Sequence, residues 1–363
     1  ALEWRGPRPA PRPVRHDPDY MVSESSPDPT SSHDAPARPD EPSGRPRRTS
    51  NKPRIVEAQE LVDEIAGESS LRVISRLQRH GYEAYLVGGC VRDLLLGRKP
   101  KDFDIATSAH PRQVKRLFRN GRIIGRRFRL VHVTYGAHVI EVSTFRREPT
   151  PRSEGEEDED LLIVEDNEYG TALEDARRRD FTINALFLDP TERRLHDFVG
   201  GLEDLEHGVL RTIGDPRVRM AEDPVRILRA VKFATRLGFR IDEDTWEAMG
   251  EVAPDLERSA RPRVMEEILR LLRSGTALGA FRMLRACGAL RVLLPTLDAY
   301  LGPREGASAE SVERAEAFWH LLEALDTEVH RGYDPSSPVA LAVLFLCIVE
   351  HEVEARSVDG EPA

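Results

Sequence analysis

The sequence predicts an α+β fold, in which a head of short strands and helices is followed by a region that is helical throughout. Two observations lead to this prediction. Between about residues 85 and 144, short β-branched runs are separated by glycines and basic residues, which is typical of antiparallel strands. Beyond Gly201, apolar residues recur at helical spacing almost to the end. A chain of 363 residues is long enough for two or three domains.

The order of these patterns suggests four segments. Residues 1–53 hold twelve of the 26 prolines and many charges, so they cannot bury enough apolar surface to offset their ordering entropy, and we expect a disordered tail. Residues 54–200 form the predicted head. Residues 201–275 form a helical neck, and residues 276–363 form a helical body that we expect to be truncated at its C-terminal end.

Composition narrows the range of functions. The net charge of −10 excludes a uniformly basic nucleic-acid binder, so any RNA contact must use a local basic patch. Three separated cysteines, Cys90, Cys287 and Cys347, predict buried thiols in a reducing compartment. The sequence contains no run of about 18 apolar residues, so we predict no membrane span. No signal peptide is visible either, and we therefore expect a cytoplasmic protein.

The head begins with helical periodicity over residues 55–81 and continues with an unusual turn. An apolar run ends in Gly88-Gly89 and is followed by a short helical run. A second predicted strand then carries Asp102 and Asp104, whose side chains would project together because residues i and i+2 of a strand share a face. Two carboxylates beside a glycine turn predict a divalent-metal site next to a phosphate cradle.

Three further strands are predicted over residues 122–125, 128–135 and 139–144. In the last of them, Glu141 lies in the middle of an apolar run, where a carboxylate is costly unless it is solvated or liganded. Glu141 at a solvated sheet rim is one interpretation. A third metal carboxylate beside the aspartate pair is the other, and we favour it.

Arginines follow in two places. Arg178 and Arg179 directly precede Asp180, and this cluster is either a set of weak surface ion pairs or a guanidinium fork for a nucleotide triphosphate that Asp180 orients. A helix predicted over residues 220–237 carries an aspartate and two arginines spaced i, i+3, i+6, which form one stripe. Such a stripe is either a surface ion pair or an acceptor and a donor fork for a base edge.

Four motifs occur in order at residues 88–93, 102–104, 178–185 and 222–226: Gly-Gly-Cys-Val-Arg-Asp, Asp-Phe-Asp, Arg-Arg-Asp-Phe-Thr-Ile-Asn-Ala and Glu-Asp-Pro-Val-Arg. Each alone is common. Together they resemble the class II nucleotidyltransferases, the family of bacterial poly(A) polymerases and tRNA CCA-adding enzymes. The resemblance extends from about residue 55 to residue 301.

The resemblance implies a nucleotidyltransferase head with a small mixed or antiparallel sheet, followed by helical neck and body domains. It implies transfer of AMP from ATP to an RNA 3′ end with release of pyrophosphate, supported by two Mg²⁺ ions. It also implies a triphosphate cradle and a base chosen by protein groups without a template. The residues implied are Asp102, Asp104 and Glu141 for metal, Asp102, Asp104 and Asp180 for catalysis, and Gly88, Gly89, Arg92, Arg178, Arg179, Asp223, Arg226 and Arg229 for the nucleotide.

Within the family, residues 123–133 distinguish the two activities. Here Arg and Leu follow Phe, which is similar to the poly(A) polymerase version and favours poly(A) addition, with Arg126, Arg127 and Arg129 as RNA contacts. CCA addition to tRNA is the alternative. A catalytically inactive RNA-binding relative is the third hypothesis, and we disfavour it because all the expected carboxylates and arginines are present.

Overall fold

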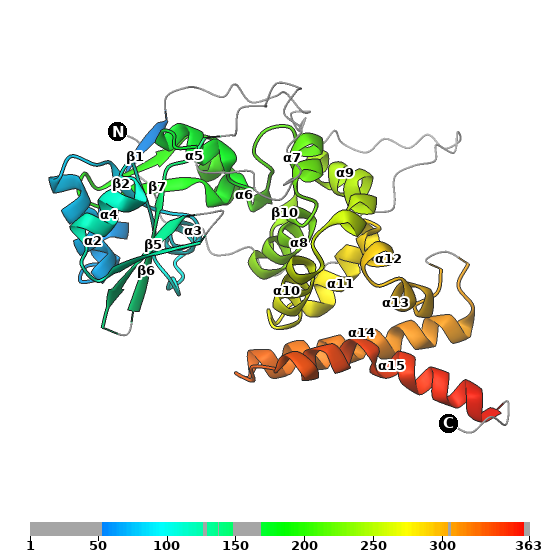
Figure 1. Ribbon diagram of the computed structural model, residues 1–363. Helices are drawn as coiled ribbons and strands as arrows, with labels where there is room; N and C mark the ends of the chain where they lie inside the picture. Colours follow the sequence, from blue (N-terminus) through cyan, green and yellow to red (C-terminus); the bar gives the residue numbers. More distant parts are fainter. Residues whose placement is uncertain (1–52, 126–128, 137, 148–167, 304–305, 359–363) are drawn as a thin grey trace, which may run out of the picture.

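The structure, a computed structural model, describes residues 53–125, 129–136, 138–147, 168–303 and 306–358. The expected disordered tail therefore lies almost entirely outside the described residues. The strands gather in a head on the left of Figure 1, and the helices that follow form the right-hand part. The predicted domain boundaries at residues 200 and 275 stay predictions.

The head is built on one eight-stranded sheet in the order β1-β8-β7-β2-β3-β6-β5-β4. Neighbouring strands are antiparallel except β3 and β6, which are parallel, so the predicted mixed sheet is confirmed. Its strands are β1 (Arg54–Glu57), β2 (Ala84–Val87), β3 (Asp104–Thr107), β4 (Gly121–Ile124), β5 (Leu130–Tyr135), β6 (His138–Thr144), β7 (Leu186–Asp189) and β8 (Arg194–Asp197).

Both faces of this sheet are covered. Successive strand residues point to opposite faces, so Ile105 of β3 enters the larger apolar cluster and Ala106 enters a smaller one. The helices of the head are α1 (Gln59–Glu64), α2 (Ser69–Arg79), α3 (Gly89–Leu95), α4 (Pro111–Leu117), α5 (Ala172–Arg178) and the 3-10 turn η2 (Thr182–Asn184). The helical periodicity predicted from residue 55 is wrong at its start, because residues 54–57 form β1 and pair with β8.

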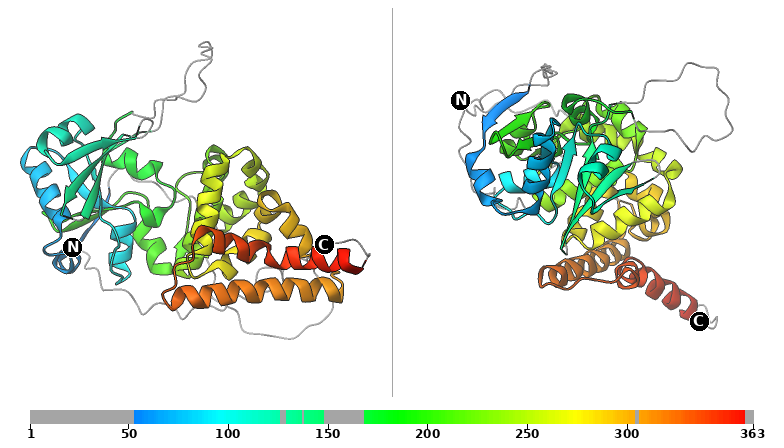
Figure 2. Two further views of the ribbon diagram at one scale, coloured as in Figure 1. Left: turned by 60° about the horizontal axis from the view of Figure 1, so that its bottom comes forward. Right: turned by 60° about the vertical axis from the view of Figure 1, so that its left-hand side comes forward.

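The chain beyond the head is mainly helical, and α14 and α15 lie side by side beneath the others (Figures 1 and 2). Its helices are α6 (Gly201–His207), α7 (Pro216–Glu222), α8 (Arg226–Leu237), α9 (Glu243–Val252), the 3-10 segment η3 (Ala253–Arg258), α10 (Arg261–Leu272), α11 (Ala277–Ala286), α12 (Ala289–Leu293), α13 (Pro295–Tyr300), α14 (Ala309–His330) and α15 (Ser337–Val358).

Two expectations for this region are corrected. The helix predicted over residues 220–237 is broken, because Asp223 precedes a proline and takes a non-helical conformation between α7 and α8. A two-stranded parallel sheet, β9 (Val209–Leu210) with β10 (Arg240–Ile241), interrupts the predicted helices. Among the described residues no helix is long and apolar enough to span a membrane.

Candidate active site

A cleft of about 430 Å³ lies where the head meets α8, and it gathers most of the predicted site residues. Nine of its lining residues were expected from the sequence, namely Gly88, Gly89, Arg92, Asp104, Arg179, Asp180, Asp223, Arg226 and Arg229. Three were not expected, namely Asn184, Phe233 and Arg263. Segments far apart in the chain therefore converge on a single cavity.

The glycine turn between β2 and α3 forms one wall of the cleft. Gly88 has a φ of +77°, a conformation that residues with a side chain rarely adopt. A Cβ at this position would lie 3.3 Å from Nη1 of Arg179. The positive φ favours glycine here, a side chain would also crowd Arg179, and the bare backbone allows a ligand to approach closely.

Arg92 of α3 is buried beside this turn and is held on two sides. Its Nε and Nη2 donate to Oδ1 of Asp93 at 2.9 and 2.7 Å, and its Nη1 donates to Oδ1 of Asn184 at 2.7 Å. These bonds use three of the five guanidinium N–H groups and leave two for a ligand.

Asp104 is the first residue of β3 and faces the cleft. Burial, the nearby Glu141 and Asp102 raise the pKa of Asp104 to about 6, against the opposing effect of Arg179. Glu141 lies on the neighbouring strand β6, and its exposed carboxylate is 3.2 Å from Nε2 of His132. The expectation that Asp102 lies in the same strand as Asp104 is wrong, because the strand begins at Asp104 and Asp102 is exposed just before it.

The donor chemistry of this group fits a divalent cation. Asp104 is a carboxylate whose charge is opposed by its surroundings and by two other carboxylates, and hard oxygen ligands suit Mg²⁺. Within the described residues, no three acidic, histidine or cysteine side chains already converge into a metal-binding arrangement. Metal binding by Asp102, Asp104 and Glu141 therefore stays a proposal.

Asp180 connects the head to the neck. Its Oδ2 accepts two hydrogen bonds from Arg229 of α8, at 2.9 and 2.5 Å, and its Oδ1 accepts from the amide of Asn184 at 3.2 Å. Burial alone would raise the pKa of Asp180, but Arg229 and these hydrogen bonds outweigh it and hold the pKa below its ordinary value. Arg179, which we expected Asp180 to orient, pairs with Asp175 at 3.0 Å instead.

The predicted base-reading pair also lines the cleft, but each member has its own partner. Oδ2 of Asp223 accepts a hydrogen bond from Nη2 of Arg263 at 2.7 Å. Nη1 of Arg226 donates to Glu222 at 3.0 Å and to the backbone carbonyl of Arg219. The Asp–Arg pair is thus fixed by neighbours on α7 and α10 rather than by each other.

Some predicted residues are not brought into the cleft. Arg178 does not line it, and its backbone carbonyl accepts a hydrogen bond from Arg219 at 2.7 Å. Arg129 is exposed just before β5. Arg126 and Arg127 lie outside the described residues.

The three residues that sequence reasoning missed carry no local signal for a ligand. Asn184 belongs to the motif at residues 178–185, yet only its hydrogen bonds to Arg92 and Asp180 show that it lies in the cleft. Phe233 reads as one more apolar helix residue. Arg263 is one of many surface-type arginines, and only the packing of α10 against α8 brings it to the cleft.

Comparison with known proteins places this geometry in a family. Residues 84–211 match the poly A polymerase head domain, and residues 238–301 match the probable RNA and SrmB-binding site of polymerase A. Poly(A) polymerase I of Haemophilus influenzae is 44% identical over 246 residues, which are 67% of this chain and 54% of that protein. A CCA-adding enzyme of Geobacillus is 41% identical over 258 residues, which are 71% of this chain and 60% of that protein.

A solved structure agrees with these sequence matches. The Bacillus stearothermophilus CCA-adding enzyme in complex with CTP is similar with a TM-score of 0.56 and 26% identity, over 81% of this chain and 88% of that chain. The chain spans less than two thirds of the length of the two curated relatives described above. On the matched head, the matched helical segment and the shared fold, the chain belongs to the nucleotidyltransferase family that contains the bacterial poly(A) polymerases and the CCA-adding enzymes.

Proposed function

We propose that this chain is a template-independent polynucleotide adenylyltransferase that adds AMP from ATP to RNA 3′ ends and releases pyrophosphate. The observation that carries the proposal is the single cleft that joins the glycine turn, five arginines, a carboxylate of raised pKa and an Asp–Arg pair. Such a set matches the needs of nucleotidyl transfer, in which positioning and charge stabilisation do most of the catalytic work.

The triphosphate would lie against the glycine turn. Gly88 and Gly89 keep side chains away from the backbone there, and Arg92 and Arg179 supply guanidinium groups from α3 and from the end of α5. Arg92 is fixed by three hydrogen bonds, so little of its side-chain entropy remains to be lost when the substrate binds. The phosphates are thereby held beside Asp104.

Asp102, Asp104 and Glu141 would hold Mg²⁺, which supplies charge neutralisation for the attacking oxygen and for the departing pyrophosphate. Asp104 would favour cation binding, because burial and the neighbouring carboxylates oppose its negative charge when no cation is present. Asp180 contributes by fixing Arg229 at the junction of head and neck.

Base choice would rest on Asp223 and Arg226. Oδ2 of Asp223 is held by Arg263, and its Oδ1 makes no hydrogen bond to the described residues, so it can accept from the exocyclic amino group of a base. Arg226 supplies donors to the adjoining ring acceptor. Adenine and cytosine both present such a donor–acceptor edge, so these two residues alone do not separate ATP from CTP.

ATP as the nucleotide and RNA as the acceptor are supported by the names of the relatives and by the sequence of residues 123–133. Three of the relatives named poly(A) polymerase I are 44–45% identical to this chain, against 38–42% for three CCA-adding enzymes. Cys90 and Cys287 are buried, as expected of thiols in a reducing compartment, and this supports the proposed cytoplasmic location.

CCA addition is the second candidate, favoured by the similarity to a solved CCA-adding enzyme bound to CTP. The deciding assay offers labelled ATP or CTP separately to an oligo(A) primer and to a tRNA that lacks its 3′ end. Long extension of the oligomer with ATP alone supports the proposal. Use of CTP that stops after two additions would replace it with CCA addition, and no incorporation with either nucleotide would favour an inactive relative.

A further inference from the structure

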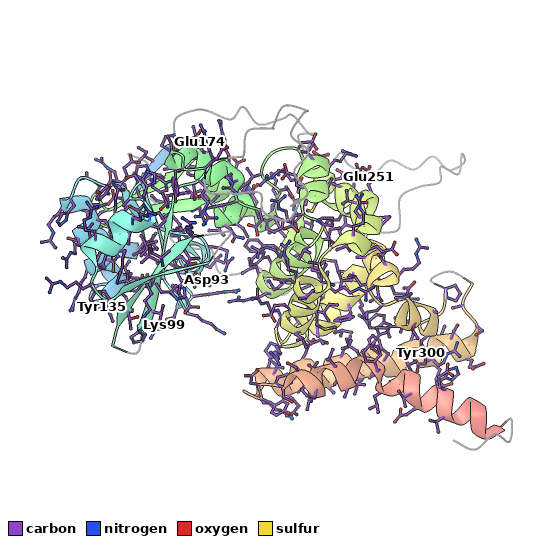
Figure 3. The ribbon with its side chains drawn as sticks, in the orientation of Figure 1. Asp93, Lys99, Tyr135, Glu174, Glu251 and Tyr300 are labelled. Carbon is purple, nitrogen blue, oxygen red and sulfur yellow. The ribbon has the colours of Figure 1, made fainter. Side chains whose placement is uncertain are left out.

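One face of α8 is turned toward the head and carries Arg229, Phe233 and Arg236, which are spaced i, i+4 and i+7 and therefore share that face. Arg229 binds Asp180 of the head through two hydrogen bonds. Arg236 lies 3.9 Å from the carboxylate of Asp93, on the side of the head that faces α8 (Figure 3). The helix thus contacts the head at two ionic points, with an aromatic ring between them.

Inside the head, hydrogen bonds join these two points. Asp93 accepts from Arg92 at 2.7 and 2.9 Å, and Arg92 donates to the amide oxygen of Asn184 at 2.7 Å. The amide nitrogen of Asn184 donates to Asp180 at 3.2 Å. The series Asp93, Arg92, Asn184 and Asp180 therefore starts and ends at carboxylates that α8 binds, and with α8 it forms a closed circuit.

Phe233 crosses this circuit. Its ring centroid lies 5.2 Å from the guanidinium carbon of Arg92 and 5.7 Å from that of Arg229, one cation from the head and one from the neck. The ring also packs edge-on against Phe181 of the head at 5.8 Å. Aromatic contact and ion pairs therefore act at the same junction.

The amide side chain of Asn184 can both accept a hydrogen bond from Arg92 and donate one to Asp180, as the series requires. It is 7% exposed, and its amide accepts on one side and donates on the other. An aspartate here would keep the bond to Arg92 but would face Asp180 with a second negative oxygen. An apolar residue would leave a buried guanidinium N–H without a partner, which is costly.

We propose that this circuit couples the neck to the triphosphate cradle, and that Asn184 is its positioning residue, fixing Arg92 relative to Arg229. The inference rests on the proposed nucleotide addition, because it assigns Arg92 to the bound triphosphate. Asn184 acts through the two arginines, and Arg236 acts from outside the cleft by holding Asp93.

The test compares Asn184→Asp, Arg236→Ala and the double variant in ATP-dependent extension of an oligo(A) primer. We expect the KM for ATP to rise about tenfold for Asn184→Asp and about threefold for Arg236→Ala, with the KM for primer unchanged. Because both act on one circuit, the double variant should stay near the tenfold value instead of multiplying to about thirtyfold. Arg217→Ala is the matched control: Arg217 forms ion pairs with Glu247 and Glu251, away from the circuit, and the variant should keep the wild-type KM.

The outcomes separate this inference from the proposed function. Wild-type protein that fails to extend the primer with ATP refutes the function. If the wild-type protein is active, two results overturn the circuit alone. One is an unchanged KM for ATP in Arg236→Ala, and the other is a KM for ATP in the double variant that equals the product of the two single effects. Arg236 is 42% exposed, so its truncation should not prevent folding, and that variant tests the circuit even if Asn184→Asp proves unstable.

Discussion

Replacing Asp104 with asparagine should make the protein more stable while abolishing nucleotide addition. The substitution keeps the shape of the side chain and removes its charge. In the folded protein the pKa of Asp104 is raised from 3.8 to about 6, because burial and two neighbouring carboxylates oppose ionisation. At one pKa unit per 1.36 kcal/mol, ionised Asp104 destabilises the fold by up to about 3 kcal/mol.

The sign of the pH dependence follows from this shift. A folded-state pKa above the unfolded value means that folding favours the protonated form, so the contribution of Asp104 to stability is complete below about pH 4 and is lost as the pH rises through about 6. Asparagine is neutral throughout. The variant should therefore exceed the wild type in unfolding free energy by about 1–3 kcal/mol at pH 8, and the difference should vanish near pH 4.

Urea unfolding in EDTA at pH 4 to 8 measures this difference. Added Mg²⁺ should stabilise the wild type and narrow the gap, since only the wild type retains the carboxylate. Asp63→Asn, at an exposed carboxylate of the same head, is the control and should shift stability by less than about 0.5 kcal/mol at any pH. A variant that is less stable than the wild type at pH 8 would refute the argument. So would a stability difference between variant and wild type that stays the same from pH 4 to pH 8.

Three further substitutions test the cleft and its support. Gly88→Ala should raise the KM for ATP at least about tenfold and lower the free energy of unfolding by about 1–2 kcal/mol, because of the positive φ. Gly89→Ala, the control, should change both quantities much less, as kinetics and urea titrations of the two variants would reveal. Arg263→Gln should release Asp223 and raise the KM for ATP and for CTP alike by about threefold or more, because both bases present the edge that this pair would bind; an unchanged KM for both nucleotides would contradict the role of the pair. Gly201→Ala should destabilise the head by about 3 kcal/mol or more in urea, because its Cβ would overlap a backbone carbonyl of η2; wild-type stability would show that the turn can relax.

Local chemistry explains which parts of the fold the sequence could predict. The left-handed Gly88 and the alternating exposure along β6 are properties of a few neighbouring residues, and both were visible as patterns. The pairing of β1 with β8 joins residues about 140 positions apart, and no local periodicity contains that information. The break of the predicted 220–237 helix was readable in principle, because Pro224 disfavours a helical conformation at the residue before it.

The same distinction applies to the site. Asp104 and Asp180 stand in motifs that chemistry can interpret, but their partners are set by packing between segments. The sequence predicts that Asp180 orients the arginines beside it, yet Arg229, 49 positions away, donates two hydrogen bonds to its carboxylate. A buried carboxylate binds whichever guanidinium the tertiary fold delivers, and sequence adjacency gives no preference.

The arrangement of charge in the cleft also resolves the contrast between an acidic chain and an anionic substrate. The chain carries a net charge of −10, yet five arginines line the cleft, against three aspartates. Each of these five arginines donates to a carboxylate, which orients its remaining N–H groups before any ligand arrives. A triphosphate then meets donors that need little reorganisation, in a partly buried site where ionic strength screens them weakly. Binding in such a cleft depends on the fixed geometry of the arginines more than on net charge, which is why substitutions that disturb their partners should affect the KM for ATP as strongly as substitutions of the arginines themselves.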